Sequence, residues 1–290
     1  MKIGLLDVDG HNFPNLALMK ISSWHKAKGD DVEMFFGLNR YDKVYMAKVF
    51  TFTPDYEEVI MADEIIKGGT GYDLTSKLPQ EIESQYPDYD LYGIKDIAYG
   101  YLSRGCPRGC KFCIVAEKEG KRSVKVADLS QFWKGQKEIV LLDPNILACN
   151  DWKDLLQQCI DSKAIVDFSQ GLDIRLMTEE KQEMINQIKH RILHFAWDNA
   201  EDTMTFEKLK EFRKGFKDTD GNLLVYVLTN YNSTIEQDLD RIYKLRDVGY
   251  NPYVMIYDKV NAPTKIRHMQ RWCNSKWIFN KCRNFEDYRG

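Results

Sequence analysis

The chain has 290 residues, 43% of them hydrophobic and 29% charged, and its formal net charge is −3. This composition is typical of a globular protein with a sizeable core, and it argues against disordered, collagen-like and coiled-coil chains. No stretch approaches the roughly 18 consecutive apolar residues of a membrane helix, and no signal-peptide cleavage site follows the N-terminus. We therefore expect a cytoplasmic protein without membrane association.

Residues 1–71 predict a small Rossmann-like α/β domain. Strand-like apolar runs fall at residues 3–8, 32–36, 44–50 and 64–67. A helix is predicted between Pro14 and Gly29, because Pro suits a first helical turn and Gly follows a last one. A short helix is predicted after Pro54. Strands alternating with helices are typical of a parallel sheet.

Residues 72–96 crowd Tyr, Asp and Pro together without a clear period, which predicts a linker or a surface strap. From residue 97 the alternation resumes and continues to the end of the chain. The predicted strands are residues 97–103, 138–143, 165–169, 191–197, 223–229 and 252–257. The predicted helices are residues 125–134, 151–162, 178–188, 202–215, 234–248 and 263–275. Six such units predict a partial (β/α)6 TIM-type barrel over residues 97–262, with ligand sites at the carboxyl ends of its strands.

The cysteines divide into a cluster of three and four scattered ones. Seven is an odd number, so a disulfide framework is not expected. Cys106, Cys110 and Cys113 have the spacing C-x3-C-x2-C directly after the first barrel strand. Three thiolates on one loop can bind three irons of a 4Fe–4S cluster and leave the fourth iron open. A zinc site would usually need a fourth Cys or His at finger-like spacing, and three unrelated cysteines are the remaining alternative.

Basic residues and glycines flank the cysteines. Gly105 and Gly109 allow the loop to fold closely around an inorganic core. Arg104, Arg108 and Lys111 are expected to lower the pKa of the thiols and to offset the negative charge of a cluster.

This motif, with Phe112 before its last Cys, resembles the radical S-adenosylmethionine (SAM) superfamily. The longer string Tyr101–Val115 resembles the branch with a cobalamin-binding-like N-terminal domain. The resemblance implies that Cys106, Cys110 and Cys113 hold the cluster, that SAM chelates the open iron, and that Phe112 lies near the adenine. It also implies reductive cleavage of SAM to a 5′-deoxyadenosyl radical, with a ferredoxin or flavodoxin as electron donor.

The same resemblance suggests roles for residues that follow the barrel strands. Asp143 and Asn145 stand where the family often has a Gly-Gly-Glu-like segment facing the methionine amino group. Gln170, Asp173 and Arg175 follow the third strand, and the fork-shaped Arg175 guanidinium matches the SAM carboxylate.

Later strand ends add three more candidates. Asp198 follows the fourth strand, and Asn230 and Asn232 follow the fifth, on the adenine or the substrate side. Each candidate also has a structural reading: Asp143 could simply end a strand, and Asp198 could cap a helix.

The loop after the first strand, Asp9-Gly-His11-Asn12-Phe-Pro14, resembles the D-x-H-x-x-G loop of cobalamin-binding domains. Pro14 replaces the final Gly and the domain is short, so we do not expect cobalamin. His11 and Asn12 are candidates for the substrate side, or turn residues before a helix.

Residues 263–290 combine a net charge of +5 with interleaved aromatic residues. Basic groups can neutralise phosphates while aromatic rings stack on bases, so nucleic acid is one candidate partner. The competing reading is a C-terminal helix whose aromatics cover the barrel edge. The resemblance implies a radical SAM enzyme, with a nucleic acid, a peptide or a small metabolite as its substrate and with methyl transfer among its possible reactions. The alternative is a non-catalytic iron–sulfur or zinc-binding protein on a barrel scaffold.

Overall fold

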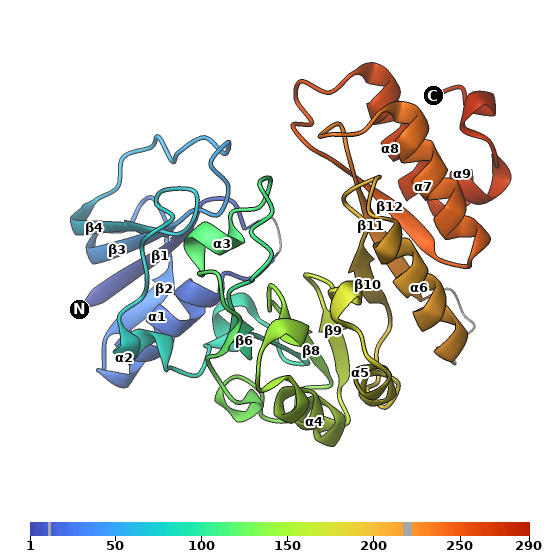
Figure 1. Cartoon of the computed structure of the whole chain (residues 1–290). Helices are drawn as coiled ribbons and strands as arrows, with labels where there is room; N and C mark the ends of the chain where they lie inside the picture. The colour runs from blue at the N-terminus through green and yellow to red at the C-terminus, as the bar shows by residue number, and fades with distance from the viewer. Residues whose placement is uncertain (11–12, 217–221) are drawn as a thin grey trace. The chain divides into compact units, whose positions relative to one another are not determined.

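A computed structural model of the chain describes residues 1–10, 13–216 and 222–290 (Figure 1). By its internal contacts the chain divides into two compact units. Unit 1 comprises Met1–Gly100 and Ala127–Ile139, and unit 2 comprises Tyr101–Val126 and Val140–Gly290. In the described ranges, no helix has the length and apolar character needed to cross a membrane.

Unit 1 is built on a four-stranded parallel sheet, which confirms the predicted α/β unit. Its strands are β1 (Lys2–Asp7), β2 (Asp31–Met34), β3 (Tyr41–Ala47) and β4 (Ala62–Gly68), in the order β2-β1-β3-β4. Helix α1 (Leu16–Ala27) begins after Asn15, whose side chain accepts hydrogen bonds from two backbone N–H groups of the first turn. Leu18 and Ile21 of this helix pack on Ile3 and Leu5, so α1 covers one face of the sheet (Figure 1).

The short helix predicted after Pro54 is wrong. Residues 54–61 form no helical turn in the structure. Tyr56 and Ile60 of this segment pack instead against the core of the second sheet face, around Val44. An irregular segment therefore covers the face that a second helix would cover in a doubly wound fold.

Residues 72–96 belong to unit 1 by their contacts. They contain α2 (Gln80–Glu83) and a 3₁₀ turn at Tyr89–Tyr92. Ile82 is buried in the core beneath α1, and Leu78 and Leu91 pack against the same core.

The remaining strands form three small sheets. They are β5 (Ile97–Gly100), β6 (Ser103–Arg104), β7 (Val124–Lys125), β8 (Glu138–Leu141), β9 (Ile165–Phe168), β10 (Leu193–Ala196), β11 (Leu223–Thr229) and β12 (Asn251–Ile256). One sheet has the order β5-β8-β9 and another, all parallel, the order β10-β11-β12, while β6 and β7 form an antiparallel pair. The chain is thus an α/β protein with several small parallel sheets, and none of the described sheets closes into a barrel.

Helices follow most of these strands. They are α3 (Val115–Lys118), α4 (Trp152–Ser162), α5 (Glu179–Ile185), α6 (Thr203–Gly215), α7 (Ile235–Asp247), α8 (Thr264–Asn274) and α9 (Lys276–Lys281). Five of the six helices predicted from residue 97 onward are confirmed. The sixth, over residues 125–134, is wrong: these residues end β7 and make a single 3₁₀ turn at Leu129–Gln131. The Phe132 ring packs so closely on Gly100 that a Cβ there would lie 2.4 Å from it.

Candidate functional site

The three clustered cysteines lie on a loop of unit 2 that folds back on itself. Gly105 begins the loop with a φ of +92°, and a Cβ at this position would lie 2.0 Å from the Arg122 carbonyl oxygen. The Cys106 N–H donates to the Gly120 carbonyl at 3.0 Å, and the Cys113 N–H donates to the Cys110 carbonyl at 3.0 Å. Only glycine fits where the two arms of the loop meet, so the sequence dictates this closed shape.

The three cysteines of the loop differ in exposure and are all free thiols. Cys106 and Cys110 are partly buried, and Cys113 is exposed. Burial raises the pKa of the Cys110 thiol, and the nearby Asp198 carboxylate raises it further, while Arg175 opposes the change. In the described part of the chain, no three His, Cys, Asp or Glu side chains stand in a ready-made metal-binding arrangement.

The expectation that flanking basic residues lower the thiol pKa is wrong for Cys110. Arg104 is engaged by the Glu119 carboxylate at 3.1 Å, and Arg108 by the Asp173 carboxylate at 2.6 Å. The basic residues of the loop therefore hold the loop in place.

Asp143, after β8, anchors the chain just before the cysteine loop. It is 5% exposed, and its carboxylate accepts hydrogen bonds from the Leu102 N–H at 3.0 Å and from the N–H and hydroxyl of Ser103. Burial raises the pKa of Asp143 to about 6 despite these hydrogen bonds. Both carboxylate oxygens are thus occupied by the loop.

Asn145, two residues further on, lies against the cysteines. It is 3% exposed, and its side-chain amide donates to the Cys106 sulfur at 3.6 Å and to the Asp173 carboxylate at 3.2 Å. Its Oδ1 is buried and accepts no hydrogen bond in the structure. A buried acceptor without a donor is costly, so this atom marks a place for a ligand donor.

Asp173, after β9, joins the loop to the strand ends. Arg108 from the loop and Arg175 from the following turn both donate to its carboxylate, at 2.6 and 2.8 Å. Burial alone would raise the pKa of Asp173, but the hydrogen bonds from the two arginines outweigh it and hold the pKa below its usual value. The carboxylate therefore stays ionised between two cations.

Asp198 follows β10 and is close enough to Arg175 and Asp173 to interact electrostatically with both. It does not cap a helix. Burial raises its pKa to about 6, and Arg175 and Arg241 counteract the effect. Asp202 caps α6 instead, because its carboxylate accepts from the Thr205 N–H at 3.0 Å.

The remaining predicted residues are spread more widely. The Phe112 ring meets the Tyr231 ring after β11 edge to face, with 5.5 Å between ring centroids. Asn230 adopts a φ of +61° and donates to the Tyr257 carbonyl at 2.9 Å, which is a turn contact. Gln170 and Asn232 are exposed and join none of these contacts in the described residues.

The chemistry of the residues around the loop suits a metal cluster with an amino-acid ligand, although their side chains are not arranged as a metal site in the described residues. Three thiols lie on one tight loop, the Asn145 amide contacts Cys106 and has a buried Oδ1 without a partner, and the Arg175 guanidinium binds the Asp173 carboxylate. Thiol sulfur suits iron, an amide oxygen suits an amino group, and a guanidinium suits a carboxylate.

Sequence reasoning places Tyr231 on the loop after the fifth strand without a role of its own, and it misses Arg241. Arg241 of α7 is 1% exposed and donates to the carbonyls of Trp197 and Leu228, which pins the ends of β10 and β11. An Arg within an otherwise apolar helix face was the available signal.

The loop after β1, which resembles a cobalamin-binding loop in sequence, is described only in part. His11 and Asn12 lie outside the described residues. The Asp9 carboxylate accepts from the Val49 and Phe50 N–H groups at 2.8 Å each, so it joins the loops after β1 and β3. Gly69 has a φ of +94°, and a Cβ there would lie 2.5 Å from the Lys48 carbonyl oxygen.

No protein-family model matches the chain, and a search of curated proteins found no similar sequence.

Proposed function

We propose that the chain is a radical SAM enzyme with a partial (β/α)6 barrel. The observation that carries the proposal is the convergence of strand-end side chains on the cysteine loop. Asn145 follows β8 and contacts Cys106, and Asp173 follows β9 and binds Arg108 of the loop. Asp198 follows β10, and its negative charge adds to the effect of burial in raising the pKa of the Cys110 thiol. Ligand sites of parallel α/β folds lie at the carboxyl ends of the strands, so this convergence supports a cofactor site at the loop.

The strand order supports the barrel part of the proposal. Strands β5, β8 and β9 are followed in order by β10, β11 and β12. The Leu172 N–H donates to the His194 carbonyl at 2.7 Å, and the Val166 N–H to the Lys189 carbonyl at 2.7 Å, which links the segments around β9 and β10. These two hydrogen bonds between separate three-stranded sheets support a run of six strands that is open at both edges, which is the partial barrel we propose. The small N-terminal domain would then be a Rossmann-like addition without cobalamin.

The resemblance assigns a role to each of these residues. Cys106, Cys110 and Cys113 would hold three irons, Arg175 would bind the SAM carboxylate, and Asn145 Oδ1 would accept from the amino group. With a cluster bound, one electron from a ferredoxin or flavodoxin would cleave SAM to methionine and a 5′-deoxyadenosyl radical, and the radical would abstract hydrogen from a second substrate to give 5′-deoxyadenosine.

The test is anaerobic reconstitution with iron and sulfide. We expect about four irons per chain and dithionite-dependent formation of 5′-deoxyadenosine from SAM. Cys110→Ala should abolish both, whereas Cys282→Ala, which removes a partly buried thiol outside the loop, should change neither. Bound zinc without SAM turnover would instead support the non-catalytic alternative.

A further inference from the structure

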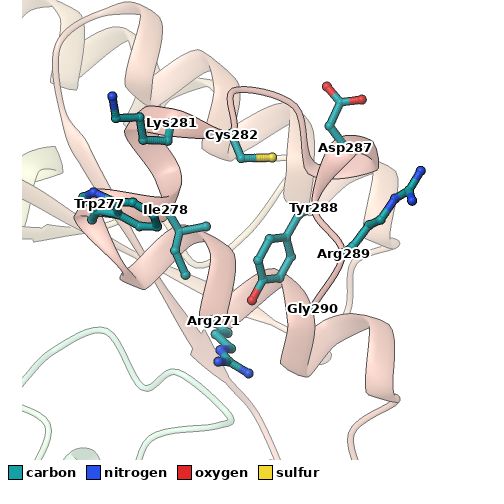
Figure 2. Close-up of a pocket in the computed structure, with 9 residues that line it drawn as sticks. All are labelled: Arg271, Trp277, Ile278, Lys281, Cys282, Asp287, Tyr288, Arg289 and Gly290. Atoms are coloured by element: carbon teal, nitrogen blue, oxygen red, sulfur yellow. The ribbon is translucent and has the colours of Figure 1, made fainter.

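The last helices of unit 2 form a shallow, open surface hollow of about 340 Å³, which we call the Trp277 pocket. Its volume falls within the roughly 300–1,000 Å³ range of small-molecule sites. It is lined chiefly by Arg271 of α8, by Trp277, Ile278 and Lys281 of α9, and by Tyr288 and Arg289. Figure 2 shows the Tyr288 ring and Ile278 across the hollow from one another, with Arg271 below them and Lys281 and Arg289 toward opposite edges.

A rigid frame supports this pocket. Trp272 is fully buried, its indole N–H donates to the Cys282 carbonyl at 2.7 Å, and its ring contacts those of Phe279 and Phe285. The Asn274 side chain accepts from the Val254 N–H at 2.7 Å, which ties α8 to β12. The pocket is therefore held by the core, as a preorganised binding site requires.

Trp277 has no such role in the core. It is 73% exposed, although Trp272 on the preceding helix is 0% exposed. The structural reading of the C-terminal aromatics thus accounts for Trp272, Phe279 and Phe285, but it leaves Trp277 unexplained. A large exposed aromatic side chain beside a hollow is a feature of binding surfaces.

The charge around the pocket is positive. Arg271, Lys281 and Arg289 form no ion pair with any carboxylate of the described residues, and Asp287 is the one acid that lines the pocket there. Residues 263–290 carry a net charge of +5, whereas the rest of the chain sums to −8. Three unpaired cations around aromatic rings suit a ligand that is both anionic and planar.

We propose that the Trp277 pocket binds single-stranded nucleic acid, with a base stacked on Trp277 and phosphates at Arg271, Lys281 and Arg289. A polyanion without rings, such as poly-glutamate, would use the cations but would leave the exposed indole without a stacking partner. Bases use both, because each has a π-face and sits between phosphates. If nucleic acid binds at the Trp277 pocket, it is also the substrate class of the radical chemistry; this second step rests on the proposed function.

The test measures the binding of a fluorescein-labelled single-stranded oligouridylate to the full chain by anisotropy over a range of salt concentrations. No SAM or reductant is added, so the outcome does not depend on the proposed enzyme activity. We expect Trp277→Ala to weaken binding at least about fivefold with an unchanged salt slope, because stacking is largely uncharged.

Arg271→Gln, Lys281→Gln and Arg289→Gln are combined in a second variant. We expect it to reduce the slope of log K against log salt by about 2, at roughly 0.7 per lost phosphate contact. Phe52→Ala removes an aromatic ring that is 82% exposed in unit 1, and Lys77→Gln with Lys95→Gln removes exposed charges of unit 1. These control variants should bind like the unaltered chain.

Three results would overturn the proposal. The first is no binding of the oligonucleotide by the unaltered chain. The second is equal binding by the Trp277→Ala variant. The third is equal binding of poly-glutamate in competition, which would point to an acidic protein partner.

Discussion

The Arg108 guanidinium lies 2.6 Å from the Asp173 carboxylate, although 65 residues separate them in the chain. This ion pair fastens the cysteine loop to the segment after β9. The Arg108 side chain is 31% exposed and that of Asp173 is 7% exposed, so water screens the interaction only in part.

Removal of this pair should loosen the loop before any cofactor is added. We expect Arg108→Gln to speed chymotryptic cleavage after Phe112 about two- to fivefold in the metal-free protein, since a partly exposed ion pair contributes up to about 1 kcal/mol. Lys121→Gln removes an exposed charge of the same loop and serves as the control. Equal cleavage rates for both variants would show that the pair does not restrain the loop.

Gly105 should be indispensable for the loop, and Gly109 should not. Alanine at Gly109 meets no atom within 4 Å and costs about 1 kcal/mol for its positive φ. Alanine at Gly105 would also collide with the Arg122 carbonyl. We expect Gly105→Ala to lose most of its iron after reconstitution while Gly109→Ala retains it, with iron assayed colorimetrically and thermal unfolding as the folding control.

Asp143 should make part of the stability depend on pH. Its pKa is about 6 in the folded protein against 3.8 in the unfolded chain, so the folded state binds the extra proton between these values. Its contribution to the free energy of unfolding is therefore largest below about pH 4, falls by up to about 3 kcal/mol as the pH rises to about 6, and is constant above.

Asp143→Asn removes this titration. The difference in unfolding free energy between the unaltered chain and the variant, measured in urea, should shrink over that pH window. A difference that stays constant with pH would contradict the role of Asp143. Asp198, whose pKa is also about 6, titrates in both proteins and cancels in the comparison.

Arg241 should be a key residue for the stability of the last three strands. Arg241→Met would leave the buried Asp238 carboxylate without its 2.6 Å partner, and we expect a loss of about 3–5 kcal/mol in urea unfolding. The double variant with Asp238→Asn should recover much of this loss, because the uncompensated charge is gone. No recovery would mean that the hydrogen bonds to the Trp197 and Leu228 carbonyls account for the loss.

The sequence predicts most of the fold because its periodicity is local. Strands β8 to β12 and helices α4 to α8 follow apolar patterns that each element carries in itself. The two wrong helices share a cause. Residues 54–61 and 125–134 have helix-compatible spacing, but Tyr56, Ile60 and Phe132 pack on cores formed by distant residues. Tertiary contacts determine the conformation of these two segments, and the spacing of apolar residues does not reveal such contacts.

The candidate site follows the same division. Cysteine spacing and position after strands indicate Cys106, Asn145 and Asp173, because strand ends meet at one edge of a parallel arrangement. The pairing of Arg108 with Asp173, and the use of both Asp143 oxygens by Leu102 and Ser103, depend on residues more than 35 apart. Such pairings arise only when the chain is folded.

The Asp173 carboxylate binds both Arg108 and Arg175, and this shared partner couples ligand binding at Arg175 to the restraint of the cysteine loop at Arg108. A ligand carboxylate that takes Arg175 away from Asp173 leaves that group to Arg108 and Asn145 alone. The strength of the Asp173–Arg108 interaction, which restrains the cysteine loop, then changes without any contact between ligand and loop. By thermodynamic reciprocity, the state of the loop must alter the affinity for that ligand by the same factor.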